Sequence, residues 1–154
     1  MALAQSKLKD NLVDWMGAVT TDQVEALTNF VDAYDLYAQD ATATSGGDFV
    51  SANKAEMLSI LLTLPPIGTA ISAAEIFALA VSTYWIGGVL TPSTVSATFV
   101  PDALKSLLIP IFSDVTIEKT YEICADQLAT AMHTVTLTVA TVAPGTPPIV
   151  GVLV

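Results

Sequence analysis

The chain has 154 residues, with five Lys, no Arg, fifteen Asp and Glu, and a formal charge of −10. Apolar residues make up 53% of it and charged residues 13%, which excludes intrinsic disorder because disordered chains are poor in apolar residues and rich in charge. So few cations cannot neutralise phosphates, so the composition also argues against a nucleic-acid partner. The length alone suggests one compact unit.

The expected helices span residues 5–17, 22–38, 51–64, 72–86, 101–110 and 116–133. Apolar residues three and four positions apart predict these helices, and polar residues 39–48 and the segment around Pro92 predict loops. Asp22 with Glu25, and Ser72 with Glu75, predict capping boxes at two helix starts. Pro110 is expected to end or kink its helix.

The helices repeat with a period of about 50 residues. Three helices share one apolar pattern: Phe30, Ala33, Tyr34 and Tyr37; Phe77, Ala80, Val81 and Tyr84; Leu128, Ala131, Met132 and Val135. After the first two come further aligned residues: Phe49, Val50 and Leu58, then Phe99, Val100 and Leu108. The unit would be a helix, a loop and a second apolar helix, with only the first helix kept in the third copy. Coincidence is the alternative, because amphipathic helices share this spacing.

Two uncharged stretches, residues 57–74 and 76–101, could be mistaken for membrane spans. Pro65 and Pro66 interrupt the first, and glycines, a proline and hydroxyl side chains interrupt the second, whereas a spanning helix needs about 20 predominantly apolar residues. We expect both stretches to form buried core, with no membrane partner. A membrane-inserted phage lysis protein of the holin type is the alternative.

The C-terminal residues change character. Residues 134–139 alternate between Thr and apolar residues, which predicts a strand, and a Pro-rich turn then leads to the uncharged segment 149–154. An apolar terminal strand needs a partner. It either forms a hairpin within the chain or pairs with a neighbouring subunit, and we expect the neighbour. The candidate interface residues are Val135, Leu137, Val139, Ile149, Val150, Val152, Leu153 and Val154.

The residue types that carry chemistry form no recognisable site. Cys124 is the single cysteine, so no disulfide can form within the chain, and His133 is the single histidine. A Cys–His dyad is the remaining enzymatic reading, but no motif supports it. Asp32, Asp35, Asp40 and Asp48 lack the spacing of a calcium loop. We therefore expect no enzyme, no cofactor, no metal and no small-molecule substrate. The first nine residues lack a signal-peptide pattern, and we interpret them as mature sequence.

Two adjacent segments, Phe77–Tyr84 and Gly87–Val95, carry a family resemblance. They resemble a recurring segment of small uncharacterised virion structural proteins of tailed bacteriophages, which tend to begin Met-Ala-Leu followed by Lys-Leu-Lys-like residues, as this chain does. Phe77 departs from the pattern, because such proteins often have Trp there. The resemblance implies a non-enzymatic virion protein assembled in the host cytoplasm: a capsid decoration or cement protein, or a neck or tail subunit. Its implied partners are other virion proteins and copies of itself.

The sequence thus predicts a mainly α fold. We expect a compact bundle of about five to six helices over residues 1–133, followed by a β-rich C-terminal arm over residues 134–154.

Overall fold

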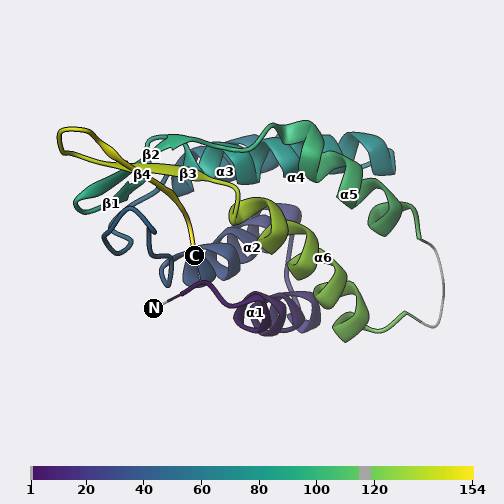
Figure 1. The fold of residues 1–154 in the computed structure, drawn as a ribbon. Helices are drawn as coiled ribbons and strands as arrows, with labels where there is room; N and C mark the ends of the chain where they lie inside the picture. The colour runs from purple at the N-terminus through teal and green to yellow at the C-terminus, as the bar shows by residue number, and fades with distance from the viewer. Residues whose placement is uncertain (1, 115–118) are drawn as a thin grey trace.

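The computed structural model describes residues 2–114 and 119–154, and it confirms the mainly α prediction (Figure 1). The helices of these residues are α1 (Gln5–Gly17), α2 (Gln23–Ala38), α3 (Lys54–Leu61), α4 (Ala70–Trp85), α5 (Pro101–Ser113) and α6 (Tyr121–Thr136). The strands are β1 (Val89–Leu90), β2 (Ser93–Ala97), β3 (Ala140–Ala143) and β4 (Ile149–Val152). In Figure 1 the strands lie together at one end of the helices.

The helices form a ring around the main core. α2, α4 and α6 contribute most of the buried helical side chains, whereas α1, α3 and α5 each contribute two. α1 packs on α2 and α6, α3 packs on α2 and α4, and α5 packs on α4 and α6. α1, α3 and α5 therefore each pack between two of the helices α2, α4 and α6. This alternation closes the ring of helices.

The uncharged stretches contribute to this core, as expected. Met57 and Leu61 of α3, and Phe77 and Val81 of α4, are all buried. Over the part of the chain that the structure describes, no helix is both long enough and apolar enough to cross a membrane.

The strands form one antiparallel sheet in chain order, β1-β2-β3-β4. Residues 42–51 make a further hairpin through the bridge between Thr42 and Asp48. This hairpin pairs with both edges of the sheet: Ala43 bridges to Leu153 beside β4, and Ser51 bridges to Val89 beside β1. The three hairpins therefore close into a small ring of strands, which covers both sheet edges with the protein's own backbone.

The repeat predicted from the sequence is visible in the structure. α2, α4 and α6 each have 16 residues, and their N-cap residues Asp22, Thr69 and Thr120 each accept a hydrogen bond from the backbone N–H three residues later. The twelve aligned apolar residues of these helices are all buried. Each helix pair, α1–α2, α3–α4 and α5–α6, is followed by a hairpin, so the described residues contain three complete units. The predicted unit begins at α2, α4 or α6 and therefore leaves one helix in the third copy; grouping the helices as α1–α2, α3–α4 and α5–α6 starts each unit one helix earlier.

The outer helices refine the alignment. α1, α3 and α5 each bury two residues four positions apart, which are Leu8 and Leu12, Met57 and Leu61, and Leu104 and Leu108. Leu61 therefore corresponds to Leu108. The sequence alignment had matched Leu58 to Leu108, but Leu58 is only partly buried at the edge of the core.

The helix starts differ in part from the predictions. Asp22 caps α2 through the N–H of Glu25 as expected, but the Glu25 carboxylate accepts from the N–H and hydroxyl of Thr21. α4 is capped by Thr69, which forms a reciprocal box with Ser72. The predicted Ser72–Glu75 box is wrong, because the first turn of α4 begins two residues earlier than its apolar pattern indicates.

Other helix boundaries differ from the predicted ones because of contacts with distant parts of the chain. α3 begins at Lys54 and not at Ser51, because Ser51 pairs with Val89 of β1. α5 continues through Pro110 to Ser113, since burial of Leu108 and partial burial of residues 111–112 hold its last turn against the core. The predicted start of the last helix at Thr116 lies outside the described residues, which show α6 from Tyr121 onward.

The strand predicted for residues 134–139 is wrong. Thr134 and Thr136 lie in the last turn of α6, where their hydroxyls donate to the carbonyls of Thr130 and Met132, each at 2.7 Å. This bonding to the carbonyl four residues earlier satisfies a threonine hydroxyl inside a helix. Val135 is buried on the same helix face as Met132. This burial favours the helix over the strand that the alternation of Thr and apolar residues predicts. The strand begins later, at Ala140.

Candidate interaction surface

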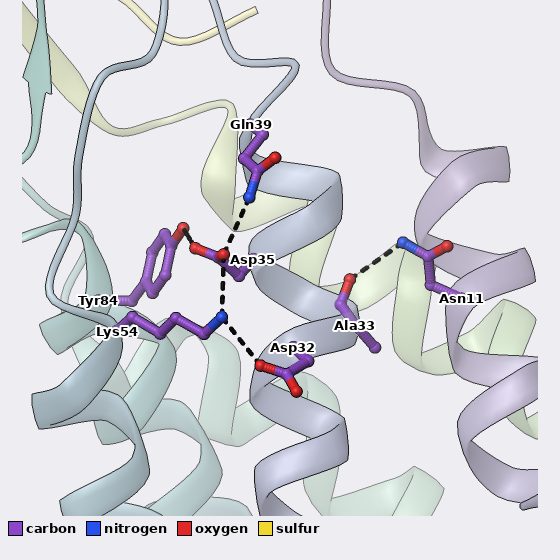
Figure 2. Close-up of polar contacts among 7 residues, drawn as sticks. All are labelled: Asn11, Asp32, Ala33, Asp35, Gln39, Lys54 and Tyr84. Carbon is purple, nitrogen blue, oxygen red and sulfur yellow. Dashed lines mark hydrogen bonds and ion pairs between the residues drawn. The ribbon is translucent and has the colours of Figure 1, made fainter.

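A polar cluster joins α2, α3 and α4 (Figure 2). The hydroxyl of Tyr84 donates to Asp35 Oδ1 at 2.6 Å. The other carboxylate oxygen of Asp35 accepts from Lys54 Nζ at 3.2 Å and from Gln39 at 3.0 Å. Lys54 also pairs with Asp32 at 2.8 Å. One lysine from α3 thus pairs with two carboxylates of α2, and a tyrosine from α4 donates to the more buried of them.

The protonation states of its side chains let this cluster hold α2, α3 and α4 together, and we term it the clamp. Burial, reinforced by the neighbouring Asp35 carboxylate, raises the pKa of Tyr84, and burial raises the pKa of Tyr34 to about 12. The hydrogen bond to Asp32 raises the pKa of Lys54. Both tyrosines therefore keep their protons, Tyr84 donates to Asp35, and Lys54 keeps its charge. The cluster therefore binds the three helices together.

The histidine and cysteine are placed apart. Both lie on α6, nine positions from each other, which at 1.5 Å per residue is about 13 Å along the axis and on opposite sides of the helix. His133 Nδ1 lies 2.6 Å from the Tyr37 hydroxyl, and burial lowers the pKa of His133. Burial also raises the pKa of Tyr37, so the tyrosine keeps its proton and the two rings are joined by a hydrogen bond. The structure does not bring Cys124 and His133 together as a dyad.

The aspartates of the possible calcium loop are also accounted for. Asp32 and Asp35 pair with Lys54, and Asp40 pairs with Lys7 at 2.7 Å. Asp48 lies in the hairpin of residues 42–51, away from this pairing. Among the residues that the structure describes, no three His, Cys, Asp or Glu side chains gather closely enough to hold a metal ion.

The predicted interface residues separate into two groups. Val135, Val139 and Leu153 are buried in the same core as the helices, and Leu137 packs against its edge. Val154 is half-buried and exchanges backbone hydrogen bonds with Thr42. The terminal segment therefore takes the first of the two expected arrangements, a hairpin with β3 within the chain, and residues 42–44 cover its other side.

The second group is exposed on β4: Ile149, Val150 and Val152. Val150 is the most exposed of the three, at 79%. All three residues lie on a strand that is paired with β3, and Val152 is also bonded to Thr44 on its other side, so their side chains are presented by paired backbone. These three residues are the exposed part of the predicted interface.

Cross-strand pairing extends the exposed group over three strands. Thr94 lies opposite Val142, and Val142 lies opposite Val150. In a second row Ala97 lies opposite Ala140, and Ala140 lies opposite Val152. Opposed residues of antiparallel strands share a face, and none of these residues is buried. We term this surface the hairpin face; it consists of Thr94, Ala97, Ala140, Val142, Val150 and Val152.

A shallow groove continues the hairpin face toward the hairpin turns. Its volume is about 500 Å³, and it shares Thr94 and Val142 with that face. Its other lining residues are Pro92, Ala143, Pro144, Gly145 and Pro148. All seven lining residues are uncharged, and four of them are proline or glycine. The groove therefore presents an uncharged concave surface to a partner.

Sequence reasoning missed the β2 and β3 part of this surface. The segment around Pro92 was expected to be a loop, whereas residues 89–97 form a hairpin. A signal was present: Thr94, Val95, Ser96 and Ala97 resemble the C-terminal residues in lacking charge and in β-branched content. The partner of β2 lies in β3, however, and that pairing is not visible in local sequence.

Comparisons with known proteins identify no relative of this chain. No protein-family model, curated protein or solved structure matches the chain. Support for a function therefore comes from the residues of the chain and from their arrangement in the fold.

Proposed function

We propose that the protein is a non-enzymatic structural component of a tailed-phage virion that acts through protein–protein contacts. Capsid decoration or cement, and a neck or tail subunit, are the roles that the sequence resemblance implies. The proposed partners are other virion proteins and copies of the chain, with no nucleic acid, membrane or small-molecule substrate. The proposed location is the virion, assembled in the host cytoplasm.

The observation that carries this proposal is an exposed, uncharged face on a closed ring of strands. Val150 and its neighbours are presented by backbone that is already paired, so a partner can bind without first ordering the segment. Binding to a preorganised surface avoids the entropy cost of ordering a loop. A rigid apolar face of this kind suits a subunit that must dock repeatedly in one geometry.

The motif resemblance adds support at the level of particular residues. Phe77, Ala80 and Tyr84 of the first motif are core residues of α4. Gly87 has a positive φ of 73° after α4, and the chain then enters the β1–β2 hairpin that contributes Thr94 to the hairpin face. The motifs thus fall on the helix and hairpin of the second structural unit.

Quantitative mass spectrometry of density-purified phage particles tests the proposal. We expect the chain to co-purify with particles at a fixed copy number. Hundreds of copies would indicate decoration or tail tube, and about six to twelve copies would indicate a neck or baseplate ring. The membrane fraction of lysing cells is the matched comparison. A chain found there and missing from particles would overturn the proposal in favour of the lysis-protein alternative.

A further inference from the structure

The charged residues are unevenly distributed over the fold. The three hairpin segments, residues 41–53, 86–100 and 137–154, contain one charged side chain, that of Asp48. Except for Asp40, which lies between α2 and the first hairpin segment, every lysine and every other acidic residue belongs to the helices or to the segments between paired helices. The protein therefore has a strongly acidic helical part and an almost uncharged hairpin part.

The lysines are already occupied within the chain. Each of the five lies within 4.0 Å of a carboxylate oxygen: Lys7 of Asp40, Lys9 of Asp126, Lys54 of Asp32, Lys105 of Glu75, and Lys119 of Asp114. Contacts between the helical surfaces of two copies would therefore bring carboxylates together without free cations to offset them. Like charges brought together at an interface cost several kcal/mol.

We infer that the hairpin face is the contact surface for a second copy of this chain. Two molecules of charge −10 can meet through the hairpin face without opposing carboxylates, and this face carries the exposed Val150 and Val152. Such a contact is isologous, with the same patch used by both copies. This inference rests on the proposed function, in which copies of the chain are partners, and it assigns that contact to a defined surface.

The experiment is sedimentation equilibrium of the full chain over a range of concentrations, at low and at high salt. We expect reversible dimers that become tighter as salt rises, because screening weakens the repulsion between the acidic helical parts. Val150→Asp should weaken the dimer at least about tenfold, since it places a like charge on both sides of the interface. Val19→Asp is the matched control, because Val19 is 97% exposed and lies in the connection between α1 and α2.

Thr94→Lys tests the same face from β2 and serves if Val150→Asp alters folding, which circular dichroism of each variant would show. A wild-type chain that stays monomeric at every concentration would overturn the inference, and so would equal weakening of the dimer by Val150→Asp and Val19→Asp. A third contrary result is a monomer that co-floats with phosphatidylcholine vesicles and loses this binding in Val150→Asp. Particle mass spectrometry separates the two proposals. A chain present in particles but monomeric alone would overturn the self-contact only, and a dimer missing from particles would overturn the virion role.

Discussion

The side-chain oxygens of Ser45 and Ser93 lie 2.7 Å apart, although 48 residues separate them in sequence. Thr141 Oγ1 lies 2.8 Å from the same Ser45 oxygen, and Thr141 is a further 48 positions along the chain from Ser93. Each hydroxyl comes from a different hairpin, and all three residues are buried. One hydroxyl from each structural unit therefore meets at the point where the hairpins close on one another.

Replacing Ser45 with Ala should destabilise the protein by roughly 1–3 kcal/mol, because it leaves buried hydroxyls of the other two hairpins without this shared partner. Thr141→Val is the matched comparison, since it keeps the side-chain shape and leaves the Ser45–Ser93 hydrogen bond in place. Urea unfolding of the two variants measures the difference. A larger loss for Thr141→Val than for Ser45→Ala would show that Ser45 is not the centre of the cluster.

Removing the Tyr84 hydroxyl should loosen the clamp among α2, α3 and α4. Tyr84→Phe keeps the buried ring but removes the donor to Asp35, and a hydrogen bond to a charged group contributes about 1.5–3 kcal/mol. Tyr121→Phe is the control, because Tyr121 is 59% exposed and surface changes usually stay within about 0.5 kcal/mol. Thermal unfolding followed by circular dichroism compares them, and equal midpoints would contradict the clamp.

His133 should make stability depend on pH in a defined window. Burial lowers the pKa of His133 below its ordinary value of 6.5, so the unfolded chain binds a proton more readily than the folded chain. The contribution is fully present above pH 6.5 and is lost as pH falls from there through the folded-state pKa. Urea unfolding at a series of pH values should show this slope in the wild type and not in His133→Gln.

Glu25 and Glu122 do not change stability in that window. The pKa values of Glu25 and Glu122 are lowered from 4.5, chiefly by hydrogen bonds at the first turns of α2 and α6, so their contributions are lost only at pH values below 4.5. A wild-type slope near pH 6 that persists in His133→Gln would assign the effect to another group.

The C-terminal segment should behave as part of the core. Leu153 is fully buried among residues of the helical core, so Leu153→Ala should cost about 2–5 kcal/mol. Val150→Ala should change stability by less than about 0.5 kcal/mol, because Val150 projects into solvent. Deleting residues 149–154 should destabilise the remaining chain. A truncated chain that keeps the wild-type unfolding midpoint would instead support a separable arm over residues 134–154.

Local patterns were sufficient for the first two helices and insufficient for the hairpins. Asp22 as the cap of α2, and the apolar spacing of α1, act between residues a few positions apart, so they could be predicted directly. The second and third hairpins depend on pairing between β2 and β3, whose partners are more than 40 residues apart. The alternation at residues 134–139 misled for the same reason, because burial of Val135 against distant residues decides its backbone.

The candidate surface was predicted in part. Ile149, Val150 and Val152 were identified from their apolar character, but so were Leu153 and Val139, which the fold buries. Alternation along a strand separates two faces without saying which one meets the core, and that choice is made by the residues packed on either side.

Composition and periodicity by themselves determined a mainly helical, strongly acidic protein with a repeat of about 50 residues and an uncharged C-terminus, because these properties are carried by single residues and their near neighbours. The tertiary structure decided that the repeat has three complete units, that their hairpins close into a ring at Ser45, Ser93 and Thr141, and that Val150 is left facing outward. Hydrogen bonds and burial between segments far apart in the chain made those choices.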